Sequence, residues 1–151
     1  MNESLLWQIR YFVYNHFADT TLPPSIEDTA SHFNISNEQA SALYRELHSR
    51  HALFLDPATL TIRMANPFSG IPTDFKVNAN GKTYYANCAW DMLGIPVALH
   101  MDAVIEAVCT ESNEVVHLEI RDGKVPQGGG SNLLVHFLLP FARWYDDLTF
   151  T

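Results

Sequence analysis

The spacing of apolar residues at the start of the chain is that of an amphipathic helix. Leu5, Ile9 and Val13 recur at four-residue intervals among polar positions. This period predicts a helix over residues 4–17. The turn-forming residues that follow, which include Pro23-Pro24, predict a loop.

Two serines mark the starts of two further predicted helices. Ser25 is followed three residues later by Asp28, a spacing that can form a capping box. Ser36 has Gln39 at the same spacing. The first of these helices is expected to end near Phe33, before a tight turn. The second carries an apolar stripe, which consists of Ala40, Leu43, Tyr44 and Leu47.

The period of the apolar positions changes after residue 51. Ala52–Leu55 and Leu60–Met64 have the composition of short strands on either side of a turn at Asp56-Pro57. Three helices followed by a small hairpin is the order of a winged helix-turn-helix, with its short helix, three-residue turn and longer helix. We therefore expect residues 1–66 to form an N-terminal domain of this kind.

Residues 66–74 hold two prolines, a glycine and polar turn formers, which is typical of a linker into a second domain over residues 67–151. Asn80-Gly81 is a strong signal for a hairpin turn. The elements predicted in this half are strands at Phe75–Val77 and Thr83–Ala86, a helix at Asn87–Leu93 that ends before Gly94 and Pro96, strands at Ala103–Cys109 and Val115–Ile120, a buried strand at Leu133–Leu139 and the start of a strand at Leu148–Thr151. The fold class expected for the chain is α+β, with a β-rich second domain.

The composition limits the classes of protein that the chain can represent. Of its 151 residues 47% are apolar and 17% are charged, and the formal net charge is −8. The apolar content excludes a disordered chain, and the acidic balance argues against a general nucleic-acid binder. No stretch approaches the roughly 20 apolar residues of a membrane span, and signal-peptide features are absent. We expect a cytoplasmic protein without a membrane partner, in which Cys88 and Cys109 are free thiols.

The charge of residues 1–66 bears on the helix-turn-helix hypothesis. This segment has four arginines, no lysine and seven acidic residues, a net charge of −3. Phosphate contacts supply most of non-specific DNA affinity. Nucleic acid is therefore not the expected partner, and the domain is interpreted as a packing module. A DNA-binding regulator is the alternative.

Tyr84–Gly94 is the segment that carries candidate chemistry. A predicted strand leads into a helix whose first turn holds Cys88 and Asp91, and their three-residue spacing places both on one face. The helix N-terminus favours a thiolate, whereas a neighbouring carboxylate disfavours a second negative charge. A thiol and a carboxyl group that share a proton suit a reaction that needs a soft nucleophile and a nearby acid. The alternative is structural, because lone cysteines are often packed in cores and first-turn aspartates often complement the helix dipole.

Several segments of the chain together point to a known family. They are Tyr85–Leu93 and Gly94–Leu99, supported by Pro67-Phe68-Ser69, Pro72-Thr73, Val135-His136-Phe137 and Trp144–Asp147. These segments resemble the alkylmercury lyase (organomercurial lyase) family, and a winged helix ahead of the lyase domain is also what that family carries. The resemblance covers most of the chain.

The resemblance implies protonolysis of the carbon–mercury bond of an organomercurial, which gives a hydrocarbon and Hg(II). It assigns Cys88 as the mercury-binding thiolate and Asp91 as the acid that relays a proton to the leaving carbon, with both at the metal. Cys109 would match a structural cysteine. Thiolates are the soft ligands that a soft metal selects. The implied partner is a small organomercurial or another thiol-reactive metal compound, and mercury is a substrate and not a cofactor.

The sequence departs from the family pattern at one position. The family's second catalytic cysteine would fall at or just past Thr151, and no cysteine lies beyond Cys109. We expect either a fragment that ends before that cysteine or a member that lacks it. A protein that binds or senses mercury without turnover is therefore the alternative to a lyase.

Overall fold

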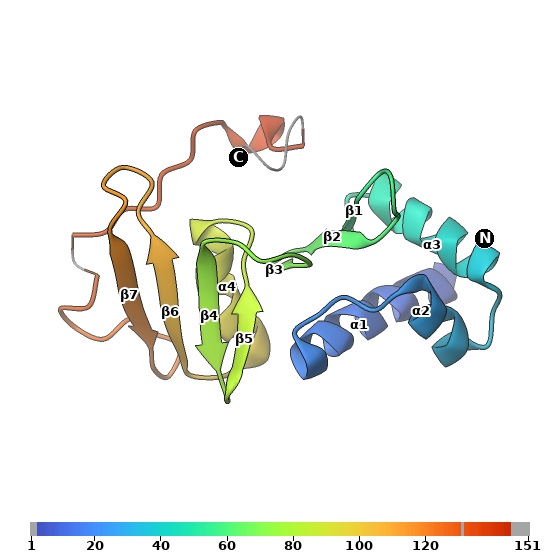
Figure 1. The fold of residues 1–151 in the computed structure, drawn as a ribbon, viewed down its shortest axis with the longest axis horizontal. Coiled ribbons are helices and arrows are strands. Elements are labelled where there is room, and N and C mark those ends of the chain that lie inside the picture. Colours follow the sequence, from blue (N-terminus) through green and yellow to red (C-terminus); the bar gives the residue numbers. More distant parts are fainter. Residues whose placement is uncertain (1–2, 131, 146–151) are drawn as a thin grey trace. The chain divides into compact units, whose positions relative to one another are not determined.

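The chain divides into two compact units, Met1–Pro72 and Thr73–Thr151. The computed structural model describes residues 3–130 and 132–145 of the chain. Over these residues, helices and two antiparallel sheets form a mixed helix-and-sheet fold (Figure 1). Within the described ranges, no helix combines the length and the apolar character needed to cross a bilayer.

Three helices and a small antiparallel sheet make up the first unit. The helices are α1 at Glu3–Thr20, α2 at Ile26–Phe33 and α3 at Asn37–Ser49, and the sheet has the order β1-β2-β3, with strands at Phe54–Leu55, Ile62–Ala65 and Phe68–Ser69. The core of this unit is apolar, and its fully buried members include Leu6, Ile9, Val13, Phe17, Tyr44 and Leu47.

Both predicted capping boxes are confirmed. The Ser25 hydroxyl accepts a hydrogen bond from the backbone N–H of Asp28, and the Asp28 carboxylate accepts one from the backbone N–H of Ser25. Ser36 and Gln39 make the same reciprocal pair. Because these contacts satisfy backbone donors that a helix leaves open, α2 and α3 begin directly after the two serines.

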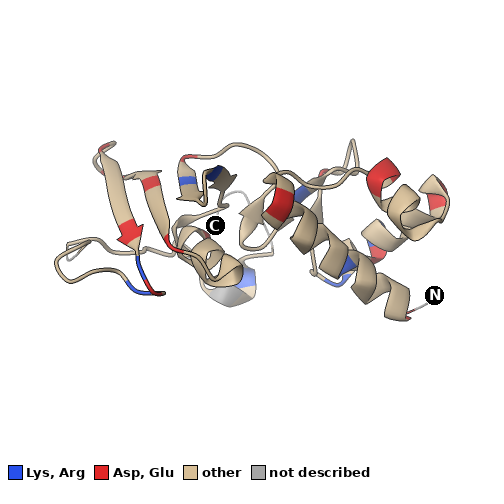
Figure 2. Ribbon diagram, turned by 90° about the horizontal axis from the view of Figure 1, so that it is seen from below, with Lys and Arg blue, Asp and Glu red and all other residues tan. Residues whose placement is uncertain are grey.

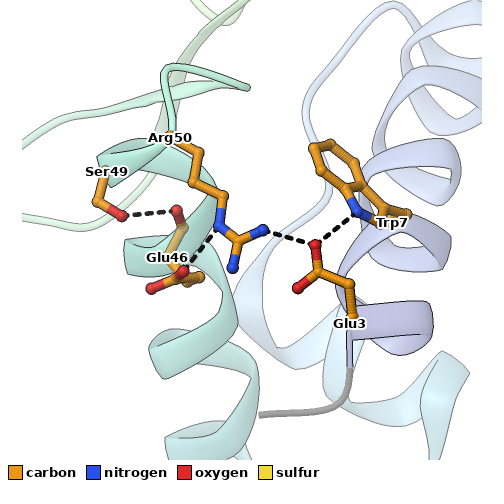
Figure 3. Close-up of polar contacts among 5 residues, drawn as sticks. All are labelled: Glu3, Trp7, Glu46, Ser49 and Arg50. Atoms are coloured by element: carbon orange, nitrogen blue, oxygen red, sulfur yellow. Dashed lines mark hydrogen bonds and ion pairs between the residues drawn. The ribbon is translucent and has the colours of Figure 1, made fainter.

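An ion-pair network links the start of α1 to the end of α3 (Figure 3). Arg50 Nη1 lies 2.6 Å from Glu3 Oε1, and Arg50 Nε lies 2.7 Å from Glu46 Oε1. The Trp7 indole N–H donates to the same Glu3 oxygen over 3.0 Å. Since these groups are partly exposed, the network adds little stability, but it engages Arg50 with two carboxylates.

The second unit is a four-stranded antiparallel sheet with α4, at Ala89–Leu99, packed on one face (Figure 1). The strand order is β5-β4-β6-β7, with β4 at Phe75–Ala79, β5 at Lys82–Tyr85, β6 at Ala103–Val108 and β7 at Val115–Ile120. The predicted turn between β4 and β5 is confirmed, because Asn80 and Gly81 have φ of 49° and 73° as a tight hairpin requires. The side chains buried on one face of the sheet include Val77, Ala79, Tyr84, Ile105 and Leu118.

The expected linker over residues 66–74 contains a strand. Phe68 and Ser69 pair with β2, and the Phe68 ring stacks on that of Phe17 with 5.3 Å between centroids. Burial of this aromatic ring explains why the segment is ordered despite its prolines and glycine.

The expected end of the helix before Gly94 and Pro96 is wrong. α4 continues through both residues to Leu99. Pro96 removes one backbone hydrogen bond of the helix, but Ile95 and Pro96 are both buried in the second unit. Packing therefore outweighs the local preference.

The predicted buried strand at Leu133–Leu139 is wrong. This segment has no regular strand, and Leu134 and Leu138 are 94% and 60% exposed. A strand needs a hydrogen-bonded neighbour, and in the described sheet β7 pairs with β6 and not with this segment. The predicted strand start at Leu148–Thr151 lies outside the described residues.

A buried pair of hydroxyl groups provides a test of the first unit's core. Tyr44 Oη and Thr29 Oγ1 lie 2.6 Å apart, and both residues are buried. Tyr44→Phe leaves the Thr29 hydroxyl without this partner, so we expect the free energy of unfolding to fall by about 1–3 kcal/mol. Urea unfolding followed by far-UV circular dichroism measures the change. The control is Tyr11→Phe, because Tyr11 is 71% exposed, and an equal loss in both variants would contradict the prediction.

Candidate functional site

The end of the β4–β5 hairpin fixes the place where the candidate site begins. The Thr73 hydroxyl donates to the carbonyl oxygen of Ala86 over 2.6 Å, and the Ala86 N–H donates to the carbonyl oxygen of Phe75 over 2.9 Å. Ala86 is fully buried. These bonds hold the backbone immediately before Asn87 and Cys88.

Cys88 and Asp91 lie together on the first turn of α4. Cys88 is the N-cap residue, in an extended conformation with φ of −153° and ψ of 177°, and Asp91 is three residues further on. Met92 and Ile95 continue the same stripe of the helix and are buried. The two candidate residues are therefore the partly buried end of the stripe with which α4 packs on the sheet.

Burial raises the pKa of both groups, and the neighbouring carboxylate raises that of Cys88 further. The pKa of the Cys88 thiol is raised first because burial removes the thiolate from water, and second because the Asp91 carboxylate is close to it. The backbone N–H groups of Asp91 and Trp90 act in the opposite direction. Burial likewise raises the pKa of Asp91 above its usual range, although Asn87 and Cys88 donate hydrogen bonds that oppose this shift. The arrangement favours retention of a proton by the pair.

Asn87 is a member of the site that the sequence interpretation missed. Its side-chain Nδ2 donates to Asp91 Oδ2 over 3.1 Å. Asn87 lies one residue before the N-cap Cys88 and so outside the helix. The spacing rule for helical side chains therefore gave no signal for this contact.

Aromatic contacts bring a later segment of the second unit to the first turn of α4. Trp90 is 57% exposed, and its ring lies 6.1 Å from that of Phe137. Phe137 in turn stacks on Trp144 at 5.1 Å, and the Trp144 indole N–H donates to the carbonyl oxygen of Leu139 over 2.9 Å. An apolar aromatic surface therefore adjoins the turn that holds Cys88.

Cys109 lies elsewhere, in the turn after β6. Both cysteines are free thiols, as predicted. The pKa of Cys109 is lowered, because the Ser112 hydroxyl and then the backbone N–H groups of Ser112 and Glu111 stabilise the thiolate. In the described part of the chain, no group of three or more His, Cys, Asp and Glu side chains could hold a metal ion.

The chemistry available at α4 is that of a thiol beside a carboxyl group. The sulfur of Cys88 is a ligand for a soft metal, and Asp91 is an acid within the same turn. The partial burial of the two groups restricts competing water.

Comparisons with known proteins bear on this site. The model of the alkylmercury lyase family, MerB, matches residues 68–150, more than half of the chain. The crystal structure of the mercury-bound form of MerB2 has a similar fold, with a TM-score of 0.66 and 22% sequence identity. The match covers 83% of this chain and 59% of the MerB2 chain. At this identity the structural likeness shows the fold alone. A comparison with curated proteins finds no match.

The opposite pKa shifts of the two cysteines give a test of the electrostatics. Iodoacetamide reacts with the thiolate, so near neutral pH we expect Cys109, with its lowered pKa, to be alkylated faster than Cys88. Asp91→Asn removes the carboxylate charge, and the resulting fall in the pKa of Cys88 should speed its alkylation by about threefold or more. Peptide mass spectrometry measures both rates.

The matched control for this alkylation test is Glu106→Gln, which removes an acid that pairs with Lys76 on the sheet. It should leave the rate at Cys88 unchanged. Alkylation of Cys88 that is faster than that of Cys109, or that slows in Asp91→Asn, would contradict the expectation.

Proposed function

Since the chain belongs to the alkylmercury lyase family, whose model matches residues 68–150, we propose that it cleaves the carbon–mercury bond of organomercurials by protonolysis. The products are a hydrocarbon and Hg(II). The observation that carries the proposal is the partly buried pair of Cys88 and Asp91 on one helical turn, with the pKa of each raised. Such a pair holds a soft ligand for mercury and a proton for the leaving carbon in one place.

The proposed reaction has two steps. In the first, the Cys88 sulfur bonds to the mercury of R–Hg–X, the X⁻ ion leaves, and the thiol proton passes to the Asp91 carboxylate. In the second, Asp91 gives this proton to the carbon, and the electron pair of the C–Hg bond becomes the new C–H bond. R–H departs, and Hg(II) stays on the Cys88 sulfur until an external thiol removes it. Burial assists the second step, because it favours the neutral acid.

The structural neighbour supports a mercury site in this fold, because it is the mercury-bound form of MerB2. This chain spans 59% of that neighbour's length, so the activity of a whole protein of this kind is part of the proposal. A cytoplasmic setting also belongs to it, since a reducing compartment keeps Cys88 as a free thiol. The reaction would serve the detoxification of organomercurials.

Capture without cleavage is the second candidate function. The observation in its favour is the number and placement of thiols: Cys88 and Cys109 are the two cysteines of the chain, and Cys109 lies in the turn after β6. A single thiolate binds R–Hg⁺, and a second soft ligand at the same mercury would weaken the C–Hg bond further.

Phenylmercury distinguishes the two candidates. The lyase proposal predicts benzene release, measured by gas chromatography, and predicts that Cys88→Ser abolishes it because mercury then has no thiolate. Asp91→Ala combined with Cys109→Ser, in which Cys88 is the one thiol, should still capture phenylmercury, seen by mass spectrometry of the intact protein. It should release at least about 100-fold less benzene than Cys109→Ser alone. Cys109→Ser is the control and should retain release. Stoichiometric capture of phenylmercury by Cys88 without release of benzene would contradict the lyase proposal and support the binding function.

We also propose that the first unit is a winged helix-turn-helix that serves in packing and does not bind nucleic acid. The order of α1, α2, a short turn, α3 and the β1-β2-β3 sheet supports the first part. The charges support the second part: α1 and α3 each contain one arginine and α2 none, and Lys and Arg are sparse along the ribbon (Figure 2).

Arg10 and Arg50, two of the four arginines of this unit, are engaged in internal contacts. Arg50 pairs with Glu3 and Glu46. Arg10 lies over the Tyr14 ring and bonds to its hydroxyl and to the carbonyl oxygen of Ala52. Few cations therefore remain to release counterions from DNA.

A measurement of DNA binding tests this proposal for the first unit. We expect no change in the fluorescence anisotropy of a labelled random duplex at low salt with micromolar protein, because affinity for phosphates would be greatest there. Charge reversal of two acids of α3, Glu38→Lys with Glu46→Lys, is the positive control and should raise affinity. Binding by the wild-type chain with a steep salt dependence would instead favour the DNA-binding regulator.

A further inference from the structure

The helices α2, α3 and α4 do not begin in the same way. α2 and α3 each start with a capping box between the N-cap serine and the side chain three residues later. In α4 the N-cap is Cys88, which makes no capping hydrogen bond with its side chain. The side chain three residues later, Asp91, is held by Asn87 instead.

The hydrogen bond from Asn87 does not serve as a helix cap. The first turn of a helix has free N–H donors, so a capping side chain must accept hydrogen bonds. Here the Asn87 amide donates, and its acceptor is a carboxyl oxygen. The contact therefore orients the Asp91 carboxyl group and does not satisfy the free N–H groups at the start of the helix.

The direction of this bond distinguishes the two oxygens of Asp91. Oδ2 accepts the amide N–H over 3.1 Å. A protonated carboxyl oxygen is a weaker acceptor than a carbonyl oxygen, so the amide favours the form of the neutral acid that carries its proton on Oδ1. The contact lies in a partly buried site, where a hydrogen bond is stronger than in water.

The position of Asn87 is itself fixed by the hairpin. It follows directly on Ala86, whose N–H and carbonyl oxygen bond to Phe75 and Thr73. The backbone that carries the amide is thus anchored to the sheet independently of α4, and the amide ties the carboxyl group to that anchor.

We propose that Asn87 is the positioning residue of the reaction: it holds Asp91 through Oδ2 so that Oδ1 presents the proton to the carbon of a mercurial bound at Cys88. This inference rests on the proposed lyase function. It assigns to Asn87 a role in proton transfer and none in capture of mercury.

Asn87→Ala in the 151-residue chain tests this role. Capture of phenylmercury by Cys88 should be unchanged, and so should thermal unfolding. Benzene release should show a kcat about tenfold lower with KM within about twofold, in line with the effect of losing a partner that orients a reactive group. The control is Asn78→Ala, which removes an asparagine bonded to Thr83 on the sheet and should leave both parameters as in the wild type.

The outcomes separate this inference from the proposed function. Benzene release by Asn87→Ala at the wild-type rate would overturn the inference and leave the lyase proposal standing. A loss of capture or of folding in Asn87→Ala would also overturn it, because the residue would then be structural.

If the wild-type chain captures phenylmercury and releases no benzene, the lyase proposal fails. The remaining question is then whether the Asn87 amide holds the Asp91 carboxyl group in place. The probe is then the ¹³Cγ resonance of Asp91 in the phenylmercury adduct, assigned with Asp91→Asn. A resonance that shifts in Asn87→Ala supports a carboxyl group held by the amide. An identical resonance in the two proteins overturns the inference.

Discussion

The candidate site depends on the packing of one stripe of α4 against the four-stranded sheet. Met92 and Ile95 are buried in this contact, and Cys88 and Asp91 lie at the open end of the same stripe. Complete burial would remove the site from any substrate, and full exposure would return both groups to their usual pKa values. The partial burial between these limits raises the pKa of both groups and keeps a proton on the pair.

The start of α4 shows how a reactive turn differs from a structural one in the same chain. Ser25 and Ser36 use their hydroxyl groups to satisfy helix N–H groups, a contribution of about 1 kcal/mol each. Cys88 occupies the same position without a capping bond. Its sulfur lies near backbone N–H groups that favour a thiolate, but it does not cap the helix. The hairpin anchor at Ala86 and the burial of Ile95 hold the helix in place instead.

The charged groups of the two units differ in their partners. In the first unit, the charged groups of Glu3, Glu46 and Arg50 are paired with one another, and such pairs orient helices more than they stabilise them. In the second unit, the carboxyl group of Asp91 has no cationic partner among the causes of its shifted pKa. A salt bridge there would lower that pKa and remove the proton that the proposed reaction needs.

The local features of the chain were determined by its sequence. The capping boxes, the Asn80-Gly81 turn and the pairing of Cys88 with Asp91 depend on residues within four positions of each other, so spacing and side-chain type are sufficient to predict them. Tertiary structure decided the features that depend on distant partners. Pro96 stays within a helix because it is buried in the second unit, and Phe68 is ordered because it stacks on Phe17. Leu133–Leu139 forms no strand because none of the described strands pairs with it. The same holds for the Asp91 proton: the sequence places the carboxyl group beside the thiol, but its degree of burial against the sheet, and the orientation that Asn87 gives it, arise only when the hairpin and the helix pack together.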